Sequence, residues 1–148
     1  QFRIELLTKL AEEFRGSPYE CLALVARERT QMQLAEFYVS MRFIQPYTTK
    51  EAEEALKKNA ENNRFSKLRF AHHLRLADFY FERAREYTLK DDPSGANFKL
   101  KEFEALVNPA RAEYKIVEEA DGYPEKLEAR AKLLALEAFI DRVMERAR

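Results

Sequence analysis

The chain has 148 residues, and its 26 lysines and arginines are balanced by 26 aspartates and glutamates. This length predicts a single domain over residues 1–148, and the charge balance disfavours a basic arm for nucleic acid or an acidic tail. One cysteine excludes an internal disulfide framework, and no apolar run approaches the roughly 18 residues that a membrane-spanning helix needs. We therefore expect a globular, intracellular protein of the cytoplasm or an organelle matrix. Because the sequence begins with Gln1, removal of a targeting peptide is compatible with it.

Glycine and proline divide the chain into helical segments. Gly16 is suited to end a first helix, and Ser17, Pro18 and Glu20 then provide an N-cap, a first-turn proline and a capping box. Thr48, followed three residues later by glutamate, repeats the capping-box spacing. Such signals predict seven helical segments with approximate ends: Phe2–Arg15, Pro18–Ile44, Lys50–Glu61, Arg64–Lys90, Ala96–Val107, Pro109–Ala120 and Pro124–Ala147.

The fold class is all-α, because good helix formers dominate and no short β-branched run occurs. We expect about six to seven helices, two or three of them long, in an elongated bundle or a short stack of helical hairpins. Asn108 before Pro109 favours a break between helices, and one kinked helix over Ala96–Ala120 is the alternative. No glycine or proline is expected inside a helix.

A five-residue sequence recurs with an offset of 42 residues, as LAEFY over Leu34–Tyr38 and LADFY over Leu76–Tyr80. The recurrence predicts a weak repeat of short and long helix pairs over residues 2–44 and 50–90, with a degenerate third pair over 96–147. Chance similarity between helices built from few residue types is the alternative. The tryptophan, glycine and proline pattern of tetratricopeptide repeats is missing, so the chain is not assigned to that family.

Residues that could form a catalytic centre are few. A nucleophile needs a base within reach, and the chain offers only Cys21, His72 and His73 for such a pair. Cys21 stands in an apolar stretch, which favours a buried structural thiol. The three glycines, at positions 16, 95 and 122, are too far apart for a phosphate-binding or dinucleotide-binding loop. We therefore expect no enzyme activity, no cofactor and no small-molecule substrate.

The segment Gln31–Met41 resembles the first bundle helix of ferritin-like proteins, in which a glutamate lies among aromatic residues on an inward face. The resemblance implies Glu36 as a metal ligand, but the family also needs Glu-x-x-His on two further helices. His72 and His73 are preceded at that spacing by arginine and phenylalanine, so we expect no metal. Glu36 and its repeat equivalent Asp78 are then expected to pair with arginines on adjacent helices.

The balanced charge is unevenly distributed along the chain. The segment Arg64–Arg75 carries four basic residues, two histidines and no acidic residue, whereas Glu102–Glu128 has eight acidic residues against three basic ones. Phe65 and Phe70 are interleaved with the cations, a combination that holds phosphates and stacks bases. The alternative is that both phenylalanines belong to the core and that the cations are solvated or pair with the acidic helices. The candidate partner-binding residues are Arg64, Lys67, Arg69, His72, His73 and Arg75.

Three functions remain open from the sequence. The leading hypothesis is a non-catalytic helical scaffold or adaptor subunit that binds other proteins in a hetero-complex. Broad apolar helix faces and seven tyrosines, a residue type enriched at interfaces, support it. The first alternative is an RNA-binding helical module that uses the basic face Arg64–Arg75, and the second is a helical-bundle enzyme or metal carrier. Among partners, we place an acidic protein surface ahead of RNA.

The RNA-binding alternative makes a direct prediction. Charge reversal at Arg64 and Arg69 should abolish RNA binding. Binding by the unchanged chain should weaken steeply with salt, because cations that neutralise phosphates release counterions. Fluorescence anisotropy with labelled single-stranded RNA at several salt concentrations measures both effects. An absent or salt-insensitive interaction would contradict the alternative.

Overall fold

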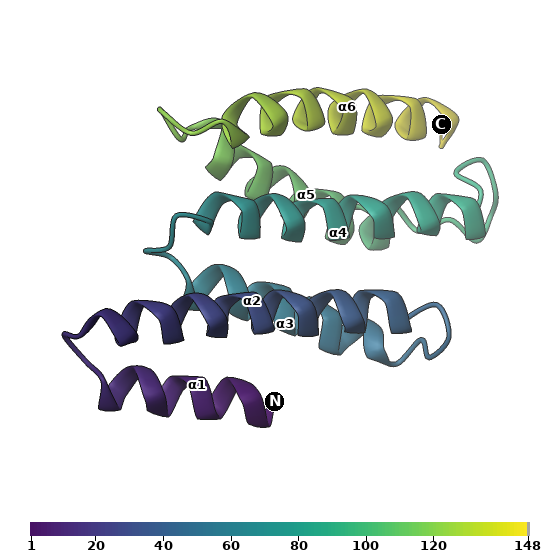
Figure 1. Ribbon diagram of the computed structural model, residues 1–148. Coiled ribbons are helices and arrows are strands. Elements are labelled where there is room, and N and C mark those ends of the chain that lie inside the picture. Colours follow the sequence, from purple (N-terminus) through teal and green to yellow (C-terminus); the bar gives the residue numbers. More distant parts are fainter. Residues whose placement is uncertain (148) are drawn as a thin grey trace. The chain divides into compact units, whose positions relative to one another are not determined.

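A computed structural model describes residues 1–147, and these residues form six α-helices with no strand among them, which confirms the all-α prediction. None of these helices is both long enough and apolar enough to cross a membrane. Contacts group the residues into two units, Gln1–Phe65 and Ser66–Arg148, and the expectation of one domain over residues 1–148 stays a prediction. The helices are α1 (Phe2–Glu13), α2 (Pro18–Met41), α3 (Thr48–Asn62), α4 (Arg69–Lys90), α5 (Leu100–Glu118) and α6 (Glu125–Arg146), as Figure 1 shows.

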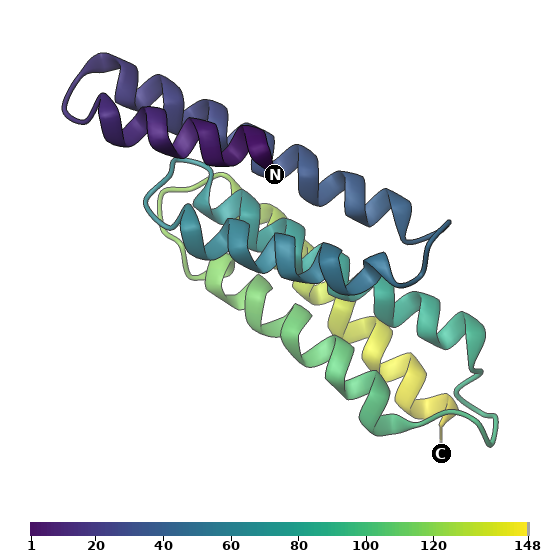
Figure 2. The same ribbon diagram turned by 90° about the horizontal axis from the view of Figure 1, so that it is seen from below.

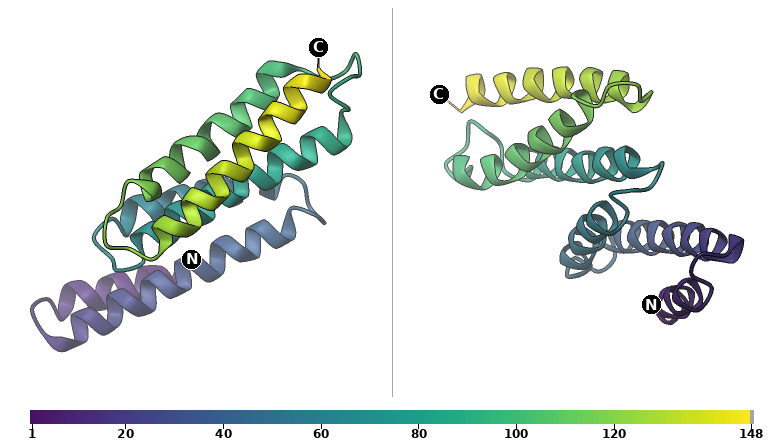
Figure 3. Two further views of the ribbon diagram at one scale, coloured as in Figure 1. Left: turned by 90° about the horizontal axis from the view of Figure 1, so that it is seen from above. Right: turned by 90° about the vertical axis from the view of Figure 1, so that its left-hand side faces the viewer.

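The first unit is built around α2, which packs against both α1 and α3. α1 and α2 form an antiparallel hairpin, visible in Figures 1 and 3. The side chains buried in this unit are mostly small, and alanine lets helix backbones approach closely because the spacing between helices depends on the side chains at their contact. The buried apolar residues are Ala11, Ala23, Ala35, Val39, Ala52, Leu56 and Ala60.

The turn between α1 and α2 depends on Gly16, whose φ of 80° lies in the left-handed region that favours glycine. The carboxylate of Glu20 accepts a hydrogen bond from the Gly16 N–H at 2.6 Å. The Ser17 hydroxyl donates to the Phe14 carbonyl at 2.7 Å. The predicted restart of the helix at Pro18 is confirmed, but the capping box is shifted by one residue, because Glu20 satisfies the N–H of the glycine rather than that of the serine.

Polar side chains join α2 to α3. The Asn59 side chain is buried and donates to the Gln31 carbonyl at 3.2 Å. The neighbouring Asn63, also buried, donates to the Gln31 side chain at 3.1 Å and to the Asn59 carbonyl at 2.9 Å. Because a buried amide without partners would be costly, these bonds select the register in which α3 lies on α2.

The second unit is a bundle in which α4, α5 and α6 all contact one another, as Figure 2 shows from below. Its core is rich in aromatic rings. The ring of Phe103 lies 5.8 Å from those of Phe98 and Phe139, and Phe139 lies 5.4 Å from Phe81. Such ring pairs stabilise a core beyond the area that they bury. The aromatic cluster therefore joins all three helices of this unit.

One carboxylate connects the same three helices through polar contacts. Asp78 on α4 accepts a hydrogen bond from the Tyr114 hydroxyl on α5 at 2.6 Å, and its other oxygen lies 2.6 Å from the Lys132 ammonium on α6. Tyr114 is fully buried. The expectation that Asp78 pairs with an arginine is wrong, because α6 presents a lysine here. Burial and the bond to Asp78 raise the pKa of Tyr114 far above its ordinary range.

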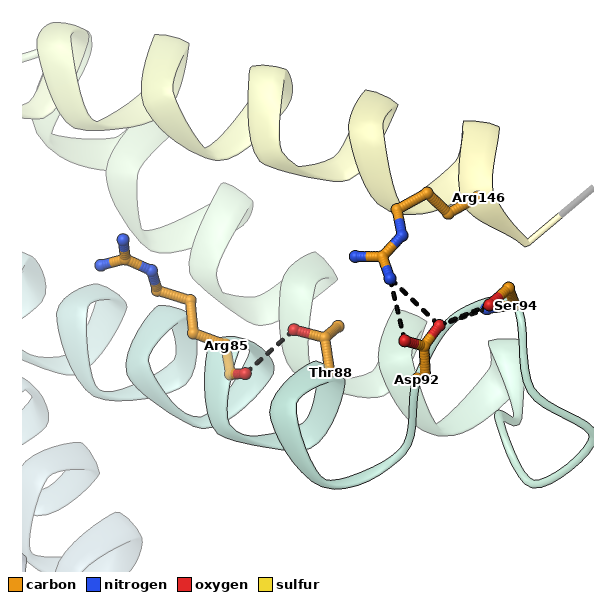
Figure 4. A network of polar contacts seen from close by, with 5 residues as sticks. All are labelled: Arg85, Thr88, Asp92, Ser94 and Arg146. Atoms are coloured by element: carbon orange, nitrogen blue, oxygen red, sulfur yellow. Dashed lines mark hydrogen bonds and ion pairs between the residues drawn. The ribbon is translucent and has the colours of Figure 1, made fainter.

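Two further ion pairs attach α6. Arg111 on α5 makes a two-pronged contact with Glu137 at 2.5 and 2.9 Å, and this hydrogen bonding lowers the pKa of Glu137. Near the end of α6, Arg146 donates to both oxygens of Asp92 at 3.1 and 2.9 Å, the network drawn in Figure 4. Hydrogen bonds from Ser94 and, to a smaller extent, the charge of Arg146 lower the pKa of Asp92. The connection after α4 is thereby tied to the far end of α6.

Helix α5 continues through Pro109, so the predicted break after Val107 is wrong, as is the expectation that no proline lies inside a helix. Proline in a helix interior costs roughly 3 kcal/mol, but each large apolar side chain that is buried contributes about 1.5–3 kcal/mol. A break would remove about half of the stripe that α5 buries, so packing outweighs the local preference. The stripe is Phe103, Val107, Ala110, Tyr114 and Val117.

Helix α4 begins at Arg69, five residues later than predicted. The Ser66 side chain accepts a hydrogen bond from the Leu68 N–H at 3.0 Å, and the Ser66 carbonyl accepts one from the Arg69 N–H at 3.3 Å. This local turn competes with helix formation. Arg64 and Lys67 therefore lie in the connection between α3 and α4, where the two units also divide.

The two copies of the predicted repeat differ in burial. Ala35 and Ala77 are both buried, but Phe37 is 55% exposed while Phe79 is fully buried. Their helices also differ in role, since α2 packs against the helix before it and the helix after it, whereas α4 begins the second unit. The repeat stays a prediction.

Burial of Tyr114 and its contact with Asp78 make the free energy of unfolding depend on pH in the alkaline range. Replacing Tyr114→Phe should lower the free energy of unfolding at pH 7 by about 1.5–3 kcal/mol, because a hydrogen bond to a charged partner is lost. The raised pKa of Tyr114 means that its ordinary value, 10.0, applies only after unfolding. The contribution of Tyr114 to the free energy of unfolding should therefore be fully present below pH 10 and be lost as pH rises above it. The substitution should make that fall shallower, as measured by urea unfolding followed by circular dichroism.

Tyr47 provides the matched control for this substitution. It is 69% exposed and donates only to the neighbouring Gln45 side chain, so Tyr47→Phe should change the free energy of unfolding by less than about 0.5 kcal/mol. If the two substituted chains had equal free energies of unfolding, and the same decrease above pH 10, the Asp78 contact would contribute nothing to stability.

Candidate protein-binding groove

An apolar groove lies between α1 and α2 in the first unit. Its volume is about 380 Å³. Figure 3 shows the two helices that form its walls, joined by their tight turn. The side chains around it are aliphatic or aromatic: Leu7, Leu10, Phe14, Tyr19, Leu22, Ala23 and Ala26.

The groove follows from the small residues at the helix contact. Ala11 and Ala23 are buried between the helices, whereas Leu22 is 65% exposed and Tyr19 is 64% exposed. The larger side chains therefore stand beside the contact instead of filling it. At the turn, the Tyr19 ring lies 5.7 Å from the Phe14 ring, which makes this end of the groove aromatic.

A second depression, of about 430 Å³, shares Leu22 and Ala26 with the groove. Arg3 from α1 and Arg29 from α2 line it and are exposed. Within residues 1–147, neither guanidinium takes part in an ion pair or a side-chain hydrogen bond. We call these two arginines the basic end. No carboxylate lines the groove or this depression, so the charged groups that line it are both positive.

The sequence contains the signal for each wall of the groove. Residues spaced by three and four share one helix face, which places Arg3 in line with the apolar residues of α1 and Arg29 in line with Leu22 and Ala26 of α2. These spacings do not predict that α1 packs against α2, which only the tertiary structure shows. The sequence therefore predicts binding residues at Arg64–Arg75 and not at the groove.

Two of the predicted binding residues lie outside the helices. Arg64 and Lys67 are exposed in the connection between α3 and α4. The Arg64 guanidinium lies 4.8 Å from the centre of the Phe65 ring. Phe65 is 85% exposed, so the interpretation of Phe65 as a core residue is wrong, because it precedes the helix whose periodicity suggested it.

Arg69 has a partner within the second unit. Its guanidinium donates to the Tyr123 hydroxyl at 2.5 Å and lies 4.8 Å from the centres of the Phe70 and Tyr123 rings. The two rings contact edge to face at 4.6 Å. Arg69 therefore joins the start of α4 to the connection before α6.

The remaining predicted residues also make contacts inside the second unit. His73 Nδ1 lies 2.6 Å from a carboxylate oxygen of Glu113 on α5, so a residue of the basic segment meets one of the acidic stretch. His72 is buried, and Arg75 lies 3.8 Å from Glu82. The six candidates are thus not one surface, and the RNA-binding hypothesis depends chiefly on Arg64 and Lys67.

Cys21 is exposed, so the prediction of a buried thiol is wrong. It stands two residues before Ala23, which is buried, and an offset of two residues turns a side chain to the other side of a helix. In residues 1–147, no group of three or more histidines, cysteines and carboxylates is placed to hold a metal ion.

Comparison of the chain with protein-family models, with curated proteins and with solved structures gives no match. The candidate site therefore stands on its geometry alone.

The exposure of the groove predicts tolerance to polar substitution. Because Leu22 is 65% exposed, Leu22→Asp should change the free energy of unfolding by less than about 1 kcal/mol. Leu136→Ala, at a fully buried position of α6, should lower it by about 2–5 kcal/mol. Urea unfolding at pH 7 compares the two. A loss above about 2 kcal/mol for Leu22→Asp would mean that the groove is filled in solution.

Proposed function

We propose that the chain is a non-catalytic helical scaffold or adaptor subunit that binds another protein in the α1–α2 groove. The observation that carries the proposal is the groove itself, a concave apolar surface bordered by exposed Leu22 and Tyr19. Single exposed apolar side chains are ordinary on protein surfaces, whereas here several apolar side chains gather around one hollow. Covering it with an apolar surface would release water from both partners.

The residue types at the aromatic end suit a protein interface. Phe14 and Tyr19 lie in contact beside the turn, with their ring planes tilted by 59°. Aromatic side chains anchor interfaces because they bury much area with few rotatable bonds. Gly16 holds the turn between them in a conformation that favours glycine, so the aromatic pair is positioned before a partner arrives. Binding therefore requires little ordering of this end of the groove.

The lining also favours a protein over a small molecule. Sites for small molecules combine apolar walls with a few placed polar groups that orient the ligand. Among the side chains that line the groove, the Tyr19 hydroxyl is the one polar group. A side chain from another protein needs no such orientation, because its own backbone positions it.

The proposal predicts that a protein cross-links to the groove. A photo-reactive benzoylphenylalanine at Tyr19 in the full chain, irradiated in an extract of the source cells, should yield a defined set of cross-linked proteins by mass spectrometry. Val25 lines the depression next to the groove. Leu22→Asp with Val25→Asp should lower the yield of cross-linked proteins at least about tenfold, since carboxylates in an apolar contact are costly to desolvate.

The matched control for this pair is Leu127→Asp with Leu134→Asp on α6. These leucines are 75% and 66% exposed, close to the 65% and 59% of Leu22 and Val25. The control should leave the cross-linked set unchanged. No cross-linked protein, or equal loss in both pairs of substitutions, would contradict the proposal.

A further inference from the structure

We infer that the α1–α2 groove receives one amphipathic helix of a partner protein, whose apolar face carries acidic side chains at one end. This inference rests on the proposed function and names the chemistry of its partner. Three features of the first unit support it: the shape of the groove, its apolar lining, and the charge at its basic end.

The length of the groove corresponds to about two turns of a helix. On the α1 wall, Leu7 and Phe14 are seven positions apart, about 10 Å at 1.5 Å per residue, or two helical turns. On the opposite wall, Leu22 and Ala26 are one turn apart. A helix laid along the groove would place residues i, i+3 or i+4, and i+7 against these walls, the usual pattern of helix-in-groove recognition.

The basic end specifies the charge of the occupant. Arg3 stands four residues before Leu7, about 6 Å further along α1, and Arg29 stands three residues after Ala26 on α2. Because α1 and α2 run antiparallel, both arginines lie at the same end, and both line the same depression. The other end, at the Gly16 turn, is aromatic. The groove is therefore asymmetric and distinguishes the two directions of a bound helix.

Charge complementarity then selects the partner. Arg3 and Arg29 have no ion-pair partner among residues 1–147, and no carboxylate lines the depression. Guanidinium groups match carboxylates in geometry and bind them through two hydrogen bonds. Acidic residues one turn beyond the apolar stripe of the occupant would meet them. Lysines at those positions would be repelled, which gives specificity and direction as well as affinity.

A selection experiment tests the inference on the full chain. A displayed library of 16-residue helices, randomised on one face, is selected on the unchanged chain after depletion on the Leu22→Asp chain. Enriched helices should carry large apolar residues at i, i+4 and i+7, with Asp or Glu about one turn beyond. Selection of no Leu22-dependent helix, or of helices without acidic enrichment, would overturn the inference.

A charge exchange then tests the basic end. The strongest selected helix and a copy with its acidic residues replaced by lysine are compared by fluorescence anisotropy. The acidic helix should bind the unchanged chain about two- to thirtyfold more tightly, the range for two exposed ion pairs. On the Arg3→Glu, Arg29→Glu chain, the preference should reverse. The matched control is Lys9→Glu with Lys50→Glu, which changes the same net charge at two exposed lysines outside the depression. Equal binding of both helices to the unchanged chain would overturn the inference.

Other occupants are separate outcomes of the same series. Self-association of the unchanged chain that Leu22→Asp abolishes, seen by sedimentation equilibrium, would replace the partner helix with a second copy. Co-sedimentation with phosphatidylserine vesicles that requires both Leu22 and Arg3 would replace it with a membrane surface. Groove-dependent cross-links with no acidic preference would overturn this inference alone, whereas absence of any groove-dependent cross-link would contradict the proposed function as well.

Discussion

The second unit depends on a single carboxylate shared by three helices. Asp78 accepts a hydrogen bond from the buried Tyr114 of α5 and lies against the ammonium group of Lys132 on α6. A phenol can be buried in the core only if its hydroxyl has a partner, and a carboxylate beside it is stable only if its charge is balanced. The two requirements are met together only when α4, α5 and α6 lie in one mutual arrangement, so Asp78 selects that arrangement as well as stabilising it.

The first unit is assembled differently, and that difference leads to its proposed function. Its helices meet through alanines, with Ala23 of α2 buried beside α1 and Asn59 of α3 hydrogen-bonded to the backbone of α2. Contacts between small side chains bring the helices close together but leave the larger side chains exposed to solvent. The α1–α2 groove is the result, an apolar surface for which this unit has no internal cover. A partner helix would supply the burial that the aromatic core supplies in the second unit.

Much of the fold could be predicted from local signals, and two of the failures come from tertiary contacts. The start of α2 at Pro18 could be predicted because it depends on residues next to it in the chain, above all on Gly16 and its positive φ. The same kind of signal predicts a helix boundary at Pro109, but the buried stripe that ends at Tyr114 and Val117 keeps α5 continuous across this proline. The candidate site failed similarly: Arg69 looked available in the sequence but is held by Tyr123.

The sequence by itself determined the helical class, the positions of most helix ends and the absence of closely spaced phosphate-binding glycines, since these depend on residues near one another along the chain. Only the tertiary structure decided which faces are covered. Leu22 and Leu136 are both leucines within helices, yet one is 65% exposed and the other is fully buried. Their difference comes from which helices meet and how large the side chains at the contact are. Burial depends on which helices pack together. The packing of α1 against α2 places Arg3 and Arg29 together beside an apolar groove.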